Sequence, residues 1–199
     1  MRLLSVADYR RMPWRNGGGE TIEIAVSPQG ASVSGFDWRV SMARVESDGP
    51  FSMFPGVDRT LAILQGAGLK LHIGDEAPVT LTGGDEPYAF PADVSTSASL
   101  IDGPVVDFNV MSRRAGFTHT VRRFELASAT DIAIRGEAQL IFCARGQLQI
   151  TDAAGTARLS EGETLHRFGR ATSLRIDPET DNSILLVEIV RIAPSTAQT

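Results

Sequence analysis

Short runs of alternating hydrophobic and polar residues recur along the chain and are separated by turns rich in glycine and proline. The alternation is clearest in residues 21–26, 36–45 and 106–112. Alternation with a period of two places the hydrophobic side chains on one face of a β-strand. No segment of ten or more residues keeps the 3.6-residue period of an amphipathic helix. The pattern therefore predicts an all-β protein, either a sandwich or a barrel.

Further runs predict shorter strands, which together cover much of the remaining chain. Residues 46–59 contain two glycines and two prolines and are expected to form a loop. Residues 1–12 are compatible with two structures, a short helical turn capped by Ser5 or an edge strand. The further strands are expected at residues 61–64, 69–73, 78–82, 118–126, 132–134, 140–144, 147–151, 156–159, 163–168, 173–176 and 184–191.

Arginine side chains lie on the faces of several expected strands. Arg39 and Ser41 share one face of residues 36–45, Arg59 follows an aromatic loop, and Arg113 continues the polar face of the strand at 106–112. A planar guanidinium binds a carboxylate through two parallel hydrogen bonds. Three arginines that enter one barrel from different strands would suit a small carboxylate or amide.

A structural ion pair is the alternative explanation for each of these arginines. Arg39 could pair with Glu23, and Arg59 could pair with Asp58 or with Asp107. Only the convergence of the arginines on one place would favour a ligand site, so both interpretations stay open at this point.

Residues 16–19, Asn-Gly-Gly-Gly, open an expected strand. Glycine-rich loops that bind phosphate open a helix instead, so we expect a tight turn that brings the backbone close to another strand or to a ligand. Trp14 and Asn16 flank the glycines. For both, a ligand contact and a structural role, as a core aromatic or as an Asx turn, stay open.

Residues 61–90 and 140–168 share one pattern of strand, glycine turn, strand, turn, strand, acidic turn and strand. The two copies are too far apart for a solenoid repeat and fit two small β-barrels in one chain. Their glycine and acidic turns resemble those of the cupin core, the double-stranded β-helix. The second copy has fewer polar candidates, so we expect the site in the first. With one gap, the matched pairs are Leu61 with Leu140, Leu69 with Leu148, Leu71 with Ile150, Leu81 with Leu159, Asp85 with Glu163, and Phe90 with Phe168.

Composition narrows the classes of function. The chain has 199 residues, of which 42% are hydrophobic, enough for one large or two small β domains. The net charge is −5 and the basic residues are scattered, which argues against binding of nucleic acid. Cys143 is the single cysteine, lies in a hydrophobic run and is expected to be a buried side chain in a reducing compartment. Without a signal peptide or a membrane-length hydrophobic run, we expect a cytoplasmic protein with no membrane partner.

The usual chemical motifs are missing from the sequence. The three histidines, His72, His119 and His166, show no metal-ligand spacing, so we expect no metal and no cofactor. There is no G-x-S-x-G elbow and the cysteine lies within a strand, so no nucleophile is predicted. Glu23 and Asp107 remain a carboxylate pair for acid–base chemistry, but no spacing connects them.

Three long motifs resemble the signatures of the HutD/Ves family of bicupin proteins, and they occur in the family order: WRNGGGETIEI, FDWRVSMARVESDGPFSMFPGVDRTL and VVDFNVMSRR. The resemblance covers nearly the whole chain. It implies two cupin barrels fused in one compact chain, at residues 1–115 and 116–199, with the pocket in the first. It also implies pairing of two copies as a homodimer.

For function, the resemblance implies a non-enzymatic protein that binds a small anionic metabolite, such as N-formylglutamate or formate, and modulates histidine catabolism. Two alternatives remain. One is a metal-independent cupin enzyme, an isomerase or hydrolase, with Glu23 or Asp58 as base; the other is an interaction protein whose motifs only determine the fold. Carried onto this chain, the pocket comprises Trp14, Asn16, Thr21, Arg39, Ser41, Phe51, Asp58, Arg59, Asn109, Met111 and Arg113.

Overall fold

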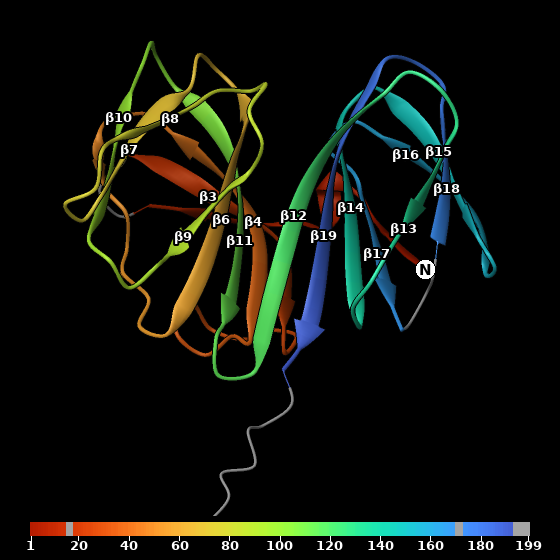
Figure 1. Ribbon diagram of the computed structural model, residues 1–199, viewed down its shortest axis with the longest axis horizontal. Coiled ribbons are helices and arrows are strands. Elements are labelled where there is room, and N and C mark those ends of the chain that lie inside the picture. Colours follow the sequence, from red (N-terminus) through yellow and green to blue (C-terminus); the bar gives the residue numbers. More distant parts are fainter. Residues whose placement is uncertain (15–17, 170–172, 193–199) are drawn as a thin grey trace, which may run out of the picture. The chain divides into compact units, whose positions relative to one another are not determined.

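A computed structural model of the protein describes residues 1–14, 18–169 and 173–192 (Figure 1). The regular secondary structure of the described residues consists of strands and one turn of 3-10 helix, η1 (Val6–Asp8), so the predicted all-β class is confirmed. Contacts divide the chain into two compact units. We call Arg10–Thr118, with Ile192, the first barrel, and Met1–Tyr9 with His119–Arg191 the second barrel.

The first barrel is built from two sheets that face each other across its core (Figure 1). Their strand orders are β2-β3-β4-β11-β6-β9 and β5-β10-β7-β8. The strands are β2 (Arg10–Pro13), β3 (Gly19–Ser27), β4 (Trp38–Val45), β5 (Gly49–Pro50), β6 (Val57–Gln65), β7 (Leu69–Ile73), β8 (Val79–Leu81), β9 (Tyr88–Pro91), β10 (Thr96–Leu100) and β11 (Val105–Arg113).

The second barrel has sheets of order β1-β17-β14-β19-β12 and β13-β18-β15-β16. The strands are β1 (Arg2–Leu4), β12 (Phe117–Leu126), β13 (Thr130–Ala133), β14 (Ala138–Arg145), β15 (Gln147–Asp152), β16 (Gly155–Ser160), β17 (Thr164–Phe168), β18 (Ser173–Pro178) and β19 (Asn182–Arg191).

The first nine residues lie with the second barrel, whereas the division implied by the family resemblance grouped them with the first. Strand β1 pairs antiparallel with β17, with Leu3 opposite Leu165. The hydroxyl of Tyr9 also bonds to Thr164 and to the carbonyl of Gly162, each at 2.8 Å. Both structures considered for the N-terminus occur, because β1 is an edge strand and η1 follows it.

The two barrels repeat one topology. The order β4-β11-β6-β9 corresponds to β12-β19-β14-β17, and β5-β10-β7-β8 corresponds to β13-β18-β15-β16. The acidic turns also match, since the Asp85 carboxylate accepts from the Thr82 amide at 2.7 Å and Glu163 accepts from the Ser160 amide at 2.8 Å. The expected bicupin fold is therefore confirmed.

Two details of the predicted pattern are wrong. Phe90 is buried in the first barrel, but its matched residue Phe168 is 68% exposed, so the repeat loses its register at this end. Residues 46–59 are not a continuous loop, because Gly49–Pro50 pairs with β10 and Val57 already begins β6. Pairing with a neighbouring strand overrides the local turn signals there.

The cores of the barrels differ in chemistry. The second core is hydrophobic throughout its described cluster, and Ile141, Cys143, Ile184 and Leu186 fill it from the central strands β14 and β19. Burial raises the pKa of the Cys143 thiol to about 11, as expected for a buried, unreactive side chain. In the first barrel, a smaller hydrophobic cluster around Leu71 leaves polar side chains on the inner faces of the strands.

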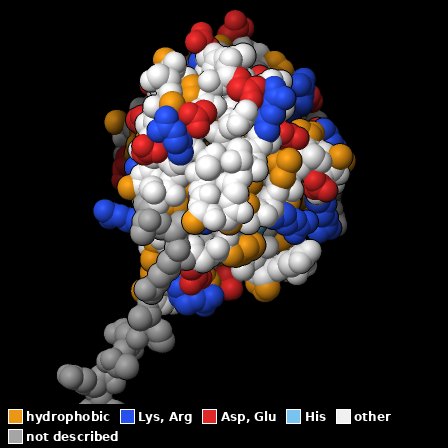
Figure 2. Space-filling view, turned by 90° about the vertical axis from the view of Figure 1, so that its right-hand side faces the viewer, with side chains coloured by type: hydrophobic (Ala, Val, Ile, Leu, Met, Phe, Trp, Pro, Cys, Tyr) orange, Lys and Arg blue, Asp and Glu red, His pale blue; other side chains and the backbone are white. Residues whose placement is uncertain are grey.

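The surface is mixed in charge. Figure 2 shows acidic and basic side chains interspersed on one face, without a broad area of a single sign. Within the described residues, the structure has no helix of the length and hydrophobicity needed to cross a membrane.

Candidate ligand-binding site

The first barrel contains a partly open cavity of about 550 Å³. Strands β3, β4, β6 and β11 contribute to its wall, together with residues 47–52. A volume of this size is typical of pockets for small molecules. Of the side chains predicted for the pocket, those that line this cavity are Trp14, Thr21, Arg39, Ser41, Phe51, Arg59, Asn109 and Met111.

Strand pairing brings these side chains together from distant parts of the sequence. On β4 and β11, Ser41 lies opposite Asn109 and Arg39 lies opposite Met111. On the other side of β11, Arg59 of β6 also lies opposite Met111. Directly opposed residues point to the same face of a sheet, so the alternation that the sequence showed in each strand becomes one polar surface.

Arg39 is held by a buried ion pair. Its Nε donates to Glu23 Oε2 at 2.7 Å, and the two side chains are only 7% and 10% exposed. Breaking such a pair costs about 3–5 kcal/mol, because the remaining charge is left buried. The interpretation of Arg39 and Glu23 as an ion pair is therefore confirmed, and Arg39 contributes a structured, largely neutralised part of the wall.

Arg59 has a different environment, a cage of aromatic rings. Its guanidinium carbon lies 5.1 Å from the ring centre of Phe51, 5.5 Å from that of Phe54 and 5.8 Å from that of Phe90. Each cation–π contact contributes about 0.5–2 kcal/mol. Burying an ion costs several kcal/mol, so the rings offset only part of the desolvation of this guanidinium.

The remaining contacts of Arg59 are weak. Its Nη2 donates to the Ser52 carbonyl at 3.3 Å and contacts Met111 Sδ at 3.5 Å, while its buried Nε has no acceptor among the described residues. Burial lowers the pKa of Arg59 to about 10, although the charge of Asp107 acts in the opposite direction. Arg59 therefore stays protonated at neutral pH and can bind an anion from the cavity.

Asp107 and Asn109 lie side by side on the inner face of β11. Asn109 Nδ2 donates to Asp107 Oδ1 at 2.7 Å, and Asp107 is completely buried. Burial raises the pKa of the Asp107 carboxyl to about 7, because it outweighs the Asn109 hydrogen bond and the charge of Arg59. This carboxyl therefore changes its protonation near neutral pH.

Gly19, the first residue of β3, has the close backbone approach that the sequence predicted. A side chain at Gly19 would collide with the carbonyl oxygen of Arg44 on β4. The Trp14 amide donates to the Gly19 carbonyl at 2.9 Å, and Trp14 Nε1 donates to Thr21 Oγ1 at 2.8 Å. These bonds hold the indole at the cavity wall, so Trp14 is both a core aromatic and a wall residue.

Two predicted site residues, Arg113 and Asp58, do not line the cavity, and a third, Asn16, lies outside the described residues. Arg113 ends β11, and its guanidinium donates to the carbonyls of Phe36 at 3.3 Å and Ser34 at 3.1 Å instead of entering the cavity. Asp58 also lies elsewhere, because its side chain binds another arginine.

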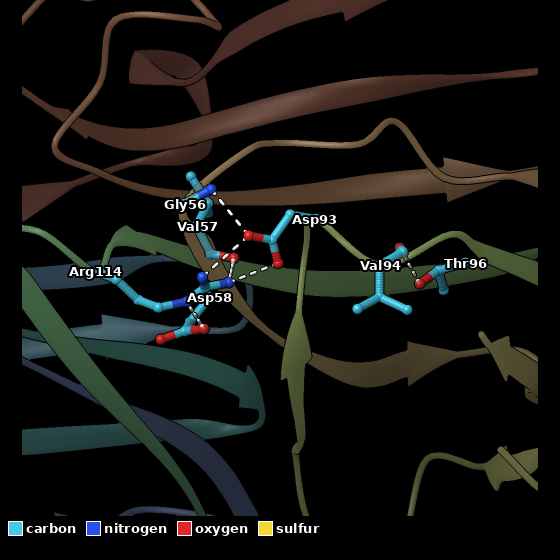
Figure 3. Close-up of polar contacts among 7 residues, drawn as sticks. All are labelled: Gly56, Val57, Asp58, Asp93, Val94, Thr96 and Arg114. Atoms are coloured by element: carbon cyan, nitrogen blue, oxygen red, sulfur yellow. Dashed lines mark hydrogen bonds and ion pairs between the residues drawn. The ribbon is translucent and has the colours of Figure 1, made fainter. Parts of the chain in front are cut away.

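That arginine is Arg114, which joins β6 to the segment after β9 (Figure 3). Its Nε donates to Asp58 Oδ1 at 2.6 Å, and its other two nitrogens donate to the two carboxylate oxygens of Asp93 at 3.0 and 2.7 Å. The Gly56 amide also donates to Asp93, at 3.0 Å. The suggested pair of Arg59 with Asp58 is therefore wrong, and Asp58 belongs to a surface ion-pair cluster.

Other wall residues were not predicted as site residues. Asp107 had a usable signal, because it shares the alternating face of β11 with Asn109 and Met111. Asp48 and Phe54 lie in segments without periodicity, so alternation carries no signal for them. Asp48 accepts from the Leu100 amide at 2.7 Å, which anchors this part of the wall to β10.

No three His, Cys, Asp or Glu side chains in the described parts of the chain come together as a metal site requires. The polar side chains that line the cavity carry guanidinium, carboxyl, amide, hydroxyl and indole groups.

A comparison with known families assigns the chain. The HutD family model matches residues 6–185. The chain belongs to the HutD family. It is 32% identical over 196 residues to an uncharacterised 21.2 kDa protein in the hutC 3′ region of Pseudomonas putida, covering 95% of this chain and 92% of that protein. It is 33% identical over 196 residues to protein Ves of Citrobacter koseri, covering 96% of this chain and 97% of that protein.

Among solved structures, HutD from Pseudomonas fluorescens SBW25, in a formate condition, matches with a TM-score of 0.82 and 29% identity. The match covers 96% of this chain and 99% of that one. The predicted membership of the HutD/Ves family is confirmed, and the family is linked to the histidine-utilisation region.

Proposed function

We propose that this protein binds a small carboxylate or formyl-amide metabolite, such as N-formylglutamate or formate, in the first-barrel cavity, and that it modulates histidine catabolism without catalysing a reaction. Arg59 would pair with the carboxylate of the ligand. The Pseudomonas putida relative is a protein of the hutC 3′ region, and this supports the link to histidine catabolism.

The observation that carries the proposal is the state of Arg59. Arg59 is 4% exposed and lines the cavity. Its guanidinium forms no ion pair with a carboxylate in the described part of the chain. A bound carboxylate would supply the missing counter-charge through strong, charge-assisted hydrogen bonds. A net-acidic protein can in this way hold an anion in a locally positive, desolvated place.

Isothermal titration calorimetry with N-formylglutamate, formiminoglutamate, urocanate and formate tests the proposal. We expect heat of binding with at least one of them, and at least a tenfold loss of affinity in Arg59→Met. Methionine keeps most of the volume and removes the charge, so the barrel should stay folded. Arg59→Lys should lose less, because it keeps the charge but not the planar fork.

Arg44→Met is the matched control, since Arg44 is an exposed arginine that pairs with Glu46 away from the cavity. It should bind as the unmodified protein does. Absence of heat with all four compounds in ligand-free, folded protein would refute the ligand assignment.

A second candidate function rests on Asp107. A cavity carboxyl with a pKa of about 7 is suited to general acid–base catalysis, whereas Glu23 is tied to Arg39 and Asp58 lies outside the cavity wall. A metal-independent isomerase or hydrolase would use Asp107 as its base. Incubation of each compound with protein, followed by NMR, would detect turnover, and Asp107→Asn should abolish it.

A further inference from the structure

Along β11, Arg59 supplies hydrogen-bond donors towards one end of the cavity, and Asp107 and Asn109 supply buried acceptors towards the other. Arg59, a donor, lies beside Met111 on the inner face of β11. Asp107 lies four residues back along the same strand, with Asn109 between them, roughly 13 Å away at the backbone. The inner face of β11 thus runs from a guanidinium end to a carboxyl–amide end.

The acceptor end has more hydrogen-bonding capacity than its neighbours use. The side-chain amide nitrogen of Asn109 donates its hydrogen bond to Asp107 Oδ1. Asp107 Oδ2 and Asn109 Oδ1 are buried and find no donor among the described residues. Asp107 is 0% exposed and Asn109 is 8% exposed, so bulk water does not freely supply these donors. Two buried acceptors side by side favour a group that donates hydrogen bonds.

We propose that Asp107 and Asn109 form a second subsite that selects carboxylates bearing an N–H donor, such as an amide, amidine or imidazole, over carboxylates without one. The proposal rests on the proposed function, because Arg59 holds the carboxylate of the same ligand. The N–H of the ligand donates to Asp107 Oδ2, and Asn109 holds the Asp107 carboxylate in place through its hydrogen bond to Asp107 Oδ1. A ligand without this donor leaves a buried acceptor unpaired, which weakens its binding.

The charge of Asp107 makes this selection depend on pH. The charged groups that line the cavity around it are Arg59 from β6, Arg39 from β4, and Asp48 from the segment before β5; Glu23 on β3 neutralises Arg39. Below neutral pH a protonated Asp107 no longer offers two acceptor oxygens. The preference for an N–H donor should therefore increase from pH 6 to pH 8, as the carboxyl ionises.

A matched pair of ligands tests the subsite: N-formylglutamate and 2-formyloxyglutarate, in which an ester oxygen replaces the amide N–H. Calorimetry at pH 8 should show at least tenfold tighter binding of the amide. In Asp107→Asn the ratio should fall to about one, because Asn109 then bonds the new amide oxygen and the new NH₂ faces the cavity. Asp58→Asn, the same change in a carboxylate outside the cavity wall, should keep the ratio.

The possible failures are distinguishable. Equal affinity for amide and ester in the unmodified protein, with binding still lost in Arg59→Met, would overturn the subsite and leave the proposed function intact. A ratio that persists in Asp107→Asn, with a normal melting temperature, would also overturn it. If neither compound binds the folded protein, the subsite falls together with the anion site on which it rests.

Discussion

At the scale of single residues, the two arginines on either side of β11, Arg39 on β4 and Arg59 on β6, have different roles. Arg39 is neutralised by Glu23 at 2.7 Å, whereas Arg59 is surrounded by three aromatic rings and lacks a carboxylate partner in the described chain. Weak contacts offset only part of the cost of burying a guanidinium. Arg59 and Asp107, which is also buried, thus keep unpaired hydrogen-bonding groups that a ligand can bind. Leaving these groups unpaired lowers the stability of the ligand-free protein.

Asp107 should make that cost measurable. Its folded pKa, about 7, is above its ordinary value of 3.8, so the folded protein binds the proton more tightly than the unfolded chain. The stabilisation by this proton is complete below about pH 3.8 and is lost as pH rises to about 7. We expect Asp107→Asn, a neutral mimic, to melt at a higher temperature than the unmodified protein at pH 8.

The difference in melting temperature between the two proteins should shrink as pH falls from 8 to 5. At pH 5 the side chain at position 107 is neutral in both folded proteins. One pKa unit corresponds to about 1.4 kcal/mol, so the effect at pH 8 should exceed about 1 kcal/mol. Calorimetric melts of ligand-free protein at each pH measure it. A difference that does not change with pH would contradict the assigned titration.

At the scale of elements, β11 is the strand around which the site is built. It pairs with β4 on one side and with β6 on the other, and it carries Asp107, Asn109 and Met111 on its inner face. Arg114 follows directly after its end and connects to Asp58 on β6 and to Asp93 after β9. The end of the strand is thereby fixed at the surface of the barrel.

This ion-pair cluster should respond to acid. The hydrogen bond from Arg114, followed by that from the Gly56 amide, lowers the pKa of Asp93 to about 2, from 3.8. The stabilisation is therefore complete above about pH 3.8 and is lost as pH falls through 2. We expect Asp93→Asn to lower the melting temperature at pH 7 and to have little effect near pH 2.

The effect should be modest and should decrease with salt, because the partners are partly exposed. Melts at low and high ionic strength measure this dependence. An Asp93→Asn protein that melts at the same temperature as the unmodified one at pH 7 and low salt would show that the cluster does not stabilise the barrel.

At the scale of the whole molecule, the two barrels share one strand topology but differ in the side chains that fill their interiors. In the described core cluster of the second barrel, strands β14 and β19 supply hydrophobic side chains such as Ile141 and Leu186, whereas β6 and β11 place Arg59 and Asp107 in the cavity wall of the first barrel. Every residue that lines this cavity lies between Met12 and Met111.

This separation predicts different effects of core mutations on stability and binding. Leu148 is completely buried in the second core, so Leu148→Ala should lower the free energy of unfolding by about 2–5 kcal/mol. Urea denaturation measures this change. At temperatures where the variant is folded, its affinity for formate should stay within twofold of the unmodified protein. A folded variant that no longer binds formate would contradict a site confined to the first barrel.

The sequence by itself determined the features that depend on near neighbours along the chain. Alternation specified the strands and their inner faces, and turns specified the repeat. Alternation also placed Arg39 with Ser41 on one strand face, and Asn109 with Met111 on another. Periodicity is a property of the strand itself, so it can be read without knowing the partner strand. The motifs of the first half also identified the family correctly.

Only the tertiary structure decided which charges are neutralised. Glu23 reaches Arg39, and Arg114 takes Asp58 away from Arg59, through pairings of strands far apart in the sequence. Arg113 turns to backbone carbonyls although its alternation matches that of Asn109. Ion pairs depend on distances of a few ångströms that register and strand order set. The sequence therefore supplied the candidates, and the folded barrel left Arg59, Asp107 and Asn109 with unused capacity facing one cavity.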